Sequence, residues 1–333
     1  MNCKHVFSLA ATAIASMLLL NPAATAAESV GEITYIGYHG APLNLIEQVA
    51  IDQGLFEKHG LKVTFTGAGS GQQMAAALLG GSAEVGVMTT TVTAPLMKSG
   101  QCITYLTSGP RTYYNLLAQP DLDLPNADKP FPENLVDLKG KKIALNARGT
   151  ALESMINALL AEAGLQPEDV TLIATGGPAA NAVAAFRAGQ VDVMMAYPIS
   201  EQLLQPGEYK DLSRLMDIEG GNPIFNLTQV FSATSCDYAE KNPDVIAAFC
   251  KASGDSYRFV NDPANREQVI KTIQSIMSLD EATATAFWNQ YNGTWPTGVI
   301  DEASYAKQEI LLPKDATLPA RDEVVHQACQ DLL

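Results

Sequence analysis

The chain has 333 residues, of which 47% are hydrophobic and 17% are charged, so it can form two lobes of ordinary size with their own cores. Its formal net charge of −15 and its sequence pI near 4.6 argue against binding to nucleic acid or to anionic lipid surfaces. They do not exclude an anionic ligand, because the Debye length is about 8 Å at physiological salt and one buried arginine outweighs remote surface carboxylates.

The N-terminus predicts a secretory signal peptide over residues 1–26. Lys4 precedes an apolar run at 6–20, and the small residues Ala24-Thr25-Ala26 supply a cleavage site. The run is too short to span a bilayer, and no later segment is long and apolar enough to do so. We therefore expect an exported protein with no direct membrane insertion, whose net charge becomes −16 once Lys4 is removed.

Strands and helices alternate in the first half of the chain in the order βαβαβ, which predicts a parallel sheet with helices on its faces. Strands are predicted at 33–37, 61–65 and 83–88, with helices at 42–53 and 73–79 between them. In such sheets ligands bind beyond the carboxyl ends of the strands. The candidate binding residues at those ends are Tyr38, His39, Gly40, Ser70, Gly71, Gln72, Thr90 and Thr91. The amides of 69–72 precede a helix and can hold a small anion or a carbonyl oxygen, although a plain strand-to-helix turn explains them equally well.

A loop rich in proline and acidic residues at 120–134 interrupts this alternation of strands and helices, which then resumes. Strands are predicted at 138–145, 170–174 and 190–195, with helices at 151–163 and 179–188. The corresponding candidates are Arg148, Gly149, Thr150 and Tyr197. The segments 74–87 and 182–194 form a weak internal repeat of an alanine-rich helix, a glycine stop and a valine strand, which predicts two related lobes.

The last part of the chain is predicted to be helical and to cover the outside of a lobe. A strand-like segment at 226–233 leads into it, and Asn226 lies where the chain would cross back to the first lobe. Helices are predicted at 243–260, 263–277, 280–292, 301–311 and 321–333. Trp288 is predicted to lie in the core, and Trp295 is a candidate to reach the ligand cleft.

Nothing in the sequence indicates catalysis or a cofactor. Four cysteines follow the signal peptide, at 102, 236, 250 and 329, and an oxidising compartment permits disulfides whose connectivity the sequence leaves open. None has metal-ligand spacing, and none belongs to an identifiable nucleophile motif. We therefore predict no catalytic residues, no metal and no cofactor.

Several segments, in this order, resemble one family. They are Gly54–Val63, Gly71-Gln72, Ala83-Glu84-Val85-Gly86, Asp137–Lys141, Ala188–Asp192 and Asp237–Asp244. Together they are similar to the nitrate/sulfonate/taurine-type periplasmic binding proteins, whose wider group includes the thiamine-pyrimidine-synthase-like proteins. The resemblance covers about residues 30–260.

The resemblance implies an α/β fold of two lobes joined by two crossover strands, with a solute held in the cleft between them. By this analogy lobe 1 is 27–113 plus 230–333 and lobe 2 is 114–229. The protein would be a periplasmic monomer that delivers a small-molecule solute to an ABC permease in the inner membrane. The threonines at 89–91 depart from the family's glycine-acid turn, so the solute stays undetermined.

Within that site, Arg148 is expected to clamp an anionic group, or else to be a surface arginine paired with a nearby acid. The hydroxyls of Ser70, Thr90, Thr91 and Thr150 are candidate donors to the same oxygens, or helix caps. Tyr38, His39 and Tyr197 can enclose an organic solute, or fill the core. Asn226 can contact the solute or satisfy the backbone of the hinge.

Three other functions stay open at this stage. The chain can be an exported receptor that reports solute occupancy to a membrane kinase, or an exported enzyme on the same scaffold. It can also bind an aromatic carboxylate or a pyrimidine in place of a sulfonate or nitrate.

Overall fold

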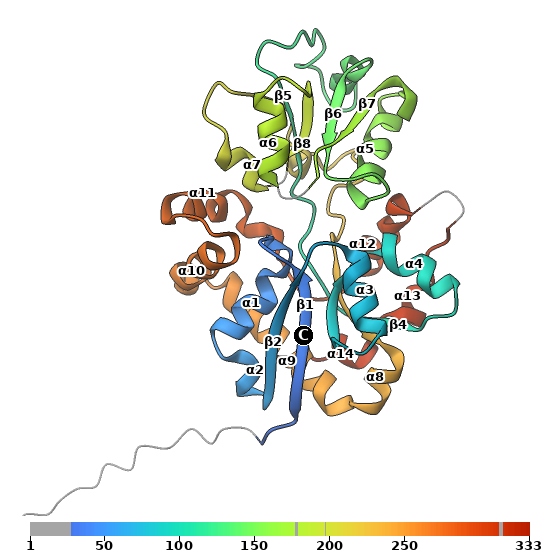
Figure 1. The fold of residues 1–333 in the computed structure, drawn as a ribbon, viewed down its shortest axis with the longest axis vertical. Coiled ribbons are helices and arrows are strands. Elements are labelled where there is room, and N and C mark those ends of the chain that lie inside the picture. Colours follow the sequence, from blue (N-terminus) through green and yellow to red (C-terminus); the bar gives the residue numbers. More distant parts are fainter. Residues whose placement is uncertain (1–27, 177–178, 197, 313–315) are drawn as a thin grey trace, which may run out of the picture.

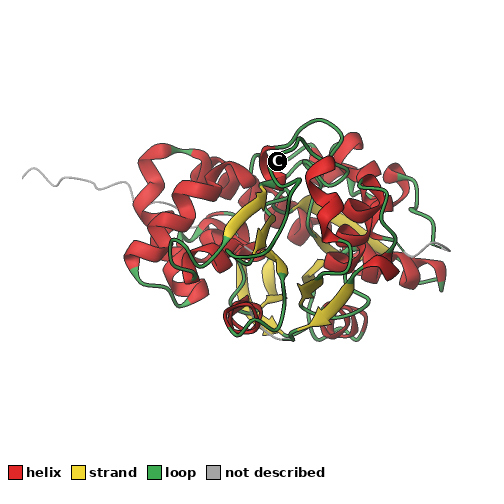
Figure 2. Cartoon of the chain, turned by 90° about the horizontal axis from the view of Figure 1, so that it is seen from above, coloured by secondary structure: helices red, strands yellow, loops and turns green. Residues whose placement is uncertain are grey.

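The structure, a computed structural model, describes residues 28–176, 179–196, 198–312 and 316–333. The predicted signal peptide and Tyr197 lie outside these residues. The described chain forms two five-stranded sheets with helices on their faces (Figure 1). Seen from above, the strands lie at the centre of the molecule and the helices flank them (Figure 2). The predicted two-lobed α/β fold is therefore confirmed.

The first sheet has the strand order β2-β1-β3-β10-β4. Its strands are β1 (Gly31–Tyr38), β2 (Leu61–Ala68), β3 (Val85–Met88), β4 (Ile103–Ser108) and β10 (Phe231–Ser235). The helices that follow these strands in the chain are α1 (Leu45–Asp52), α2 (Leu55–Lys58), α3 (Gly71–Leu79), α4 (Thr90–Lys98), α8 (Cys236–Lys241) and α9 (Pro243–Asn261). We call this sheet and these helices lobe 1.

The second sheet has the order β7-β6-β8-β5-β9, which repeats the pattern of the first. Its strands are β5 (Asn115–Ala118), β6 (Lys142–Leu145), β7 (Thr171–Ala174), β8 (Val193–Ala196) and β9 (Lys210–Ser213). Its helices are α5 (Ala151–Glu162), α6 (Ala179–Arg187) and α7 (Pro198–Leu203). We call this unit lobe 2. The units α3–β3 and α6–β8 occupy equivalent places in the two sheets, as the internal repeat predicts.

The remaining helices lie in the C-terminal part of the chain. They are α10 (Arg266–Met277), α11 (Glu281–Tyr291), α12 (Glu302–Ala306), α13 (Arg321–Val324) and α14 (Gln327–Gln330). Helix α10 packs on α1 of lobe 1, whereas α11 contacts α7 of lobe 2 (Figure 1). The C-terminal segment therefore contacts both lobes.

The sheets are mixed, which corrects the expectation of parallel sheets. In lobe 1, β10 runs antiparallel to β3 and β4, and in lobe 2, β5 runs antiparallel to β8 and β9. These two strands carry the chain from one lobe to the other, so each enters its sheet from the side of the opposite lobe. The directions of β5 and β10 fix the directions of all the other strands relative to the opposite lobe.

Strand β5 of lobe 2 follows the crossover from lobe 1 and runs away from lobe 1. Because β8 is antiparallel to β5, β8 and the parallel strands β6 and β7 run toward lobe 1. Strand β10 likewise runs away from lobe 2, so β3, β1 and β2 run toward lobe 2. The carboxyl ends of the two sets of parallel strands therefore face each other across the hinge. This is the edge at which such sheets bind ligands.

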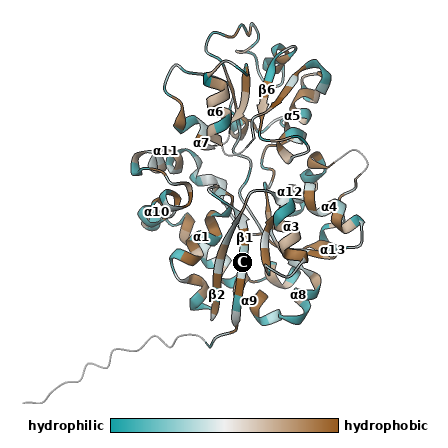
Figure 3. Cartoon of the chain, viewed as in Figure 1, coloured by the Kyte–Doolittle hydropathy of each residue, from teal (hydrophilic) through white to brown (hydrophobic). Residues whose placement is uncertain are grey.

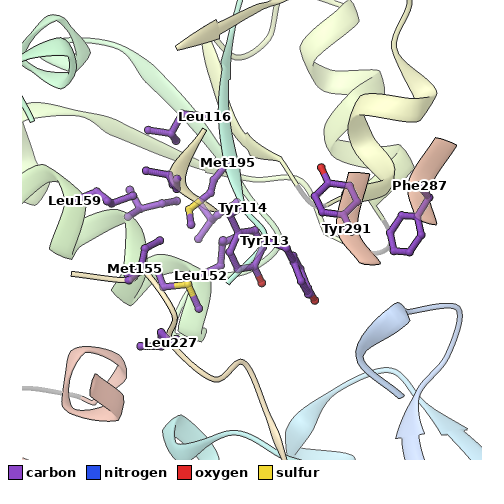
Figure 4. Close-up of a cluster of buried hydrophobic side chains, with 14 of the residues drawn as sticks. Tyr113, Tyr114, Leu116, Leu152, Met155, Leu159, Met195, Leu227, Phe287 and Tyr291 are labelled. Atoms are coloured by element: carbon purple, nitrogen blue, oxygen red, sulfur yellow. The ribbon is translucent and has the colours of Figure 1, made fainter. Parts of the chain in front are cut away.

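One hydrophobic cluster joins lobe 2 to the C-terminal helices. Tyr113 and Tyr114 precede β5 and lie beside side chains from α5 and β8, and Tyr291 of α11 lies nearby (Figure 4). Trp295 is fully buried in this cluster with its ring centroid 6.2 Å from that of Trp288. The prediction that Trp288 is core is confirmed, and the suggestion that Trp295 reaches the cleft is wrong.

Two sequence predictions of helices also need correction. The sequence predicted no helix after β3, where the structure has α4, and the predicted helix at 321–333 divides into α13 and α14. The division occurs because Val325 forms a bridge to Tyr105 of β4. Along the surface helices hydrophobic and hydrophilic residues alternate, as expected for helices with one buried face (Figure 3).

The structure pairs the four cysteines as Cys102–Cys236 and Cys250–Cys329. The first disulfide ties the chain just before β4 to α8, and the second ties α9 to α14. Within the described residues, no helix has the length and hydropathy that a membrane crossing requires.

Candidate functional site

The end of β1 is fixed by the buried side chain of Asn44. Its Oδ1 accepts a hydrogen bond from the Tyr38 amide at 3.1 Å, and its Nδ2 donates to the Tyr38 carbonyl at 2.6 Å. The Asn44 side chain thus satisfies the amide and the carbonyl of Tyr38, as the backbone of a neighbouring strand would do. A Cβ on Gly37 would come within 2.5 Å of Asn44 Oδ1, so this arrangement requires glycine at 37.

The ends of β1, of the loop before α3 and of the segment that starts α4 meet at Gly71. A Cβ at this position would lie 2.9 Å from the side chain of Val92 in α4 and 3.5 Å from the Tyr38 hydroxyl. The Tyr38 hydroxyl from β1 therefore lies beside the first residue of α3, and α4 closes the other side. Burial raises the pKa of Tyr38, so its phenol stays a neutral donor at physiological pH.

Helix α3 begins with two amides that its own hydrogen-bond ladder does not use. Ser70 is the N-cap, and its hydroxyl accepts from the Gln73 amide at 3.3 Å, so the capping alternative for Ser70 is the one the structure shows. The amides of Gly71 and Gln72 come ahead of the first intrahelical bond and lack an intrahelical acceptor. They point out of a helix end that carries partial positive charge, which suits an anion.

The two threonines at the start of α4 differ in their contacts. Thr90 is fully buried, and its hydroxyl donates to Oε1 of Gln308 at 3.0 Å. Among the described residues, Thr91 Oγ1 is buried and has no hydrogen-bond partner. Thr90 therefore has a structural contact, whereas Thr91 keeps an unused hydroxyl.

His39 and Gly40 follow Tyr38 on the exposed rim of lobe 1. The His39 ring lies against Gly67, where a Cβ would come within 3.1 Å of Nδ1. Gly40 has a φ of +66°, a conformation that favours glycine. These residues turn the chain from β1 back toward α1.

In lobe 2, Arg148 lies at the end of β6 with its side chain 60% exposed. Its guanidinium is 3.1 Å from Oε1 of Glu153, and Oε2 of the same carboxylate accepts from the Gly149 amide at 2.6 Å. The structure therefore shows the arginine paired with a nearby acid. The arginine side of this pair is exposed to solvent, which weakens the attraction, so the guanidinium can exchange Glu153 for another anion at small cost.

Thr150 is the N-cap residue of α5. Its hydroxyl donates to the Ala147 carbonyl at 2.9 Å and also lies 3.1 Å from Asn146 Oδ1. These bonds hold the loop that carries Arg148. Tyr197, the predicted residue after β8, lies outside the described residues.

Asn226 lies away from the strand ends. It has a φ of +60°, unusual for a residue other than glycine, and lines a cavity of about 290 Å³ beside the hinge with Arg111, Asp301 and Lys307. A second cavity of about 340 Å³ lies between β7 and α6. Neither contains the strand-end residues of lobe 1. Asn226 lies in the chain between β9 of lobe 2 and β10 of lobe 1, and both its hinge role and its contact with a solute stay predictions.

The sequence interpretation missed three residues that shape this site: Asn44, Glu153 and Gln308. Glu153 had a detectable signal, since it occupies the first turn of a helix close behind Arg148. Asn44 and Gln308 had none, because their roles depend on contacts that only the folded chain creates. Within the described residues there is also no group of acids, histidines and cysteines arranged to hold a metal ion.

Comparison with known proteins places the chain in a family. The sequence pattern of the NMT1/THI5-like family matches residues 45–265. A protein of Escherichia coli described as "Putative aliphatic sulfonates-binding protein" is 27% identical over 305 residues, which cover 89% of this chain and 88% of that protein. The nitrate import ATP-binding protein NrtC of Synechococcus elongatus is 28% identical over 160 residues, 44% of this chain but only 23% of that protein.

Among solved structures, the alkanesulfonate-binding protein SsuA of Xanthomonas axonopodis pv. citri, bound to MOPS, has the same fold. Its TM-score is 0.66 at 23% identity, and the match covers 90% of this chain and 99% of that one. The resemblance predicted from the sequence is confirmed by the family match, which spans about two thirds of the chain. This protein belongs to the NMT1/THI5-like family.

Proposed function

We propose that this protein is the periplasmic solute receptor of an ABC importer and that it binds a small organic sulfonate between its lobes. The observation that carries the proposal is the opposition of the two sets of strand ends, with unused donors on the lobe 1 side and the exposed, Glu153-paired Arg148 on the lobe 2 side. The named relatives described as binding sulfonates support the choice of solute. The lobes would comprise 27–113 plus 230–333 and 114–229.

The proposed contacts divide between the lobes. On lobe 1, the Gly71 and Gln72 amides, the Tyr38 phenol and the Thr91 hydroxyl supply neutral donors. On lobe 2, the exposed Arg148 supplies the one positive charge of the predicted site. A sulfonate has three equivalent oxygens, which can accept from amides on one side and from a guanidinium on the other. Closure of the lobes would bring these donors onto one anionic group.

The role is binding rather than catalysis. A receptor of this kind holds its solute by hydrogen bonds and releases it unchanged to the permease, so no general base or nucleophile is needed at the strand ends. The relatives named above are described as binding proteins and as part of a nitrate importer.

Calorimetric titration of the mature protein tests the proposal. We expect ethanesulfonate or taurine to bind at micromolar concentration or tighter, and nitrate, benzoate and a free pyrimidine to bind at least tenfold more weakly. Thermal unfolding in the same solutes provides a second readout, since a solute at 100 times its Kd adds about 2.7 kcal/mol to the free energy of unfolding. Tight binding of benzoate or a pyrimidine with no response to sulfonates would overturn the choice of solute.

A further inference from the structure

The two chain segments that connect the lobes are hydrogen-bonded to each other. Arg111 and Thr228 form an antiparallel bridge, the Gln229 amide donates to the Pro110 carbonyl at 2.8 Å, and the Gly109 amide donates to the Val230 carbonyl at 2.7 Å. The crossovers therefore form a short two-stranded ribbon, about which any motion of one lobe relative to the other must occur.

Arg111 ties this ribbon to the C-terminal segment. Its side chain is buried, with 8% of the residue exposed, and its guanidinium donates to the Thr228 hydroxyl at 2.5 Å and to Oδ2 of Asp301 at 2.6 Å. Its own amide donates to the carbonyl of Thr294 at 2.8 Å. One arginine thus connects the second crossover to the segment that starts α12.

Gln308 connects the same ribbon to the solute-facing start of α4. It is fully buried; its Oε1 accepts from the Thr90 hydroxyl at 3.0 Å and its Nε2 donates to the Thr228 carbonyl at 2.9 Å. Thr90 is followed by Thr91, whose hydroxyl is unused. A chain of buried bonds therefore runs from the start of α4, through Gln308 and Thr228, to Arg111.

We propose that Gln308 and Arg111 are positioning residues of the solute site, which couple the orientation of the start of α4 to the angle between the lobes. This proposal rests on the proposed function, because the coupling changes solute affinity only if the solute binds between closing lobes. Neither residue lies at the strand ends, so neither is expected to touch the solute. Their effect passes through Thr228, whose carbonyl accepts from Gln308 and whose hydroxyl accepts from Arg111.

The physical reason is that these bonds have no substitute. If the crossover twisted without α4, Gln308 could not keep both bonds, and either the Thr90 hydroxyl or the Thr228 carbonyl would lose its buried partner, which is costly for a buried polar group. The ribbon and α4 therefore move together more readily than apart. The cavity of about 290 Å³ beside Arg111 leaves this side of the hinge incompletely packed, which allows such a movement.

Gln330 supplies a matched control. It is also a glutamine of the C-terminal segment that bridges two backbone groups, accepting from the Ile300 amide at 2.7 Å and donating to the Leu106 carbonyl at 2.6 Å. Leu106 belongs to β4, so this bridge does not involve a crossover or α4. Replacing either glutamine by methionine removes two hydrogen bonds at nearly constant volume.

The first measurement is hydrogen–deuterium exchange of the solute-free protein, which needs no ligand. Arg111→Lys keeps the positive charge but cannot hold Thr228 and Asp301 at once. We expect it to raise exchange at least fivefold in peptides covering 89–97, which Arg111 reaches through Thr228 and Gln308, while Gln330→Met leaves those peptides unchanged. Wild-type exchange at 89–97 in Arg111→Lys would overturn the proposal.

The second measurement is the calorimetric affinity for ethanesulfonate. We expect Gln308→Met to weaken binding by about fivefold to tenfold, within the usual range for coupling between sites, and Gln330→Met to change it less than twofold at a similar fall in thermal stability. Equal affinities in the two variants would contradict the coupling. If the wild-type protein binds no ethanesulfonate, the proposed solute is wrong, and the exchange comparison alone decides whether the coupling exists.

Discussion

The two lobes have the same strand order but are stabilised differently. Both disulfides join elements that pack in lobe 1, whereas residues 114–229 contain no cysteine. At the facing strand ends, lobe 1 offers backbone amides and side chains held by buried bonds, such as Thr90 with Gln308. Lobe 2 offers Arg148, which is largely exposed and pairs with the neighbouring carboxylate of Glu153.

This difference indicates that lobe 1 sets the shape of the solute site, whereas lobe 2 supplies its charge. A rigid wall with fixed donors fixes the shape of a solute site, because little conformational entropy is lost when the solute binds. An exposed arginine on the opposite wall supplies charge and can adapt as the lobes approach. We therefore expect perturbations of lobe 1 to reduce stability, and perturbations at Arg148 to reduce affinity.

The largest expected effect is the loss of a disulfide in lobe 1. Replacing Cys250 and Cys329 together by alanine opens a loop of 79 residues. Chain entropy predicts a loss of about 4 kcal/mol in the free energy of unfolding, measurable by urea denaturation with and without the reductant that opens both disulfides. An unchanged unfolding midpoint in the double variant would show that lobe 1 does not depend on this cross-link.

A smaller effect, on affinity alone, is expected from Arg148→Ala. Losing a charge-assisted hydrogen bond to a sulfonate should cost about 1.5–3 kcal/mol, or roughly tenfold to over a hundredfold in Kd. Arg187→Ala is the control, because Arg187 is also a lobe 2 arginine paired with an acid, at 2.7 Å from Glu208, but it is the last residue of α6, the helix end opposite the facing strand ends. Calorimetry that finds the same affinity in both variants would remove Arg148 from the site.

The smallest effect concerns a buried acid of lobe 1. Glu47 in α1 is almost fully buried and accepts from the Ser232 hydroxyl at 2.7 Å; burial raises its pKa, although the hydrogen bonds it accepts oppose this. Since the folded-state pKa lies above that of the unfolded chain, the stability from the protonated group is complete below the unfolded pKa, near 4.3, and is lost as the pH rises through the folded value.

Glu47→Gln stays neutral at every pH and should avoid that loss. We expect the free energy of unfolding of the variant, relative to wild type, to rise between pH 4 and pH 7, because only the wild type then ionises a buried carboxyl. Exposed Glu267 on α10 supplies the control substitution, Glu267→Gln. A difference between Glu47→Gln and wild type that does not change with pH would show that Glu47 ionises freely in the folded state.

The fold was largely readable from the sequence, because strand patterns and glycine stops are local signals. Helix α4 was missed since it contains three threonines and Pro95, which are poor helix formers, so contacts with the rest of lobe 1 must stabilise it. The site was readable only in outline. Strand ends could be located, but Gln308 contacts Thr90 across 218 positions of the chain, and no local pattern marks such a contact.

Solution X-ray scattering tests the central claim, that facing lobes close on a small anion, most directly. The radius of gyration of the protein without residues 1–26 should fall by about 1 Å or more when ethanesulfonate is added at 100 times its Kd, as expected for hinge closure around a ligand. Arg148→Ala should show the same fall only at a higher sulfonate concentration. A radius of gyration that stays constant while calorimetry shows full occupancy would contradict the account.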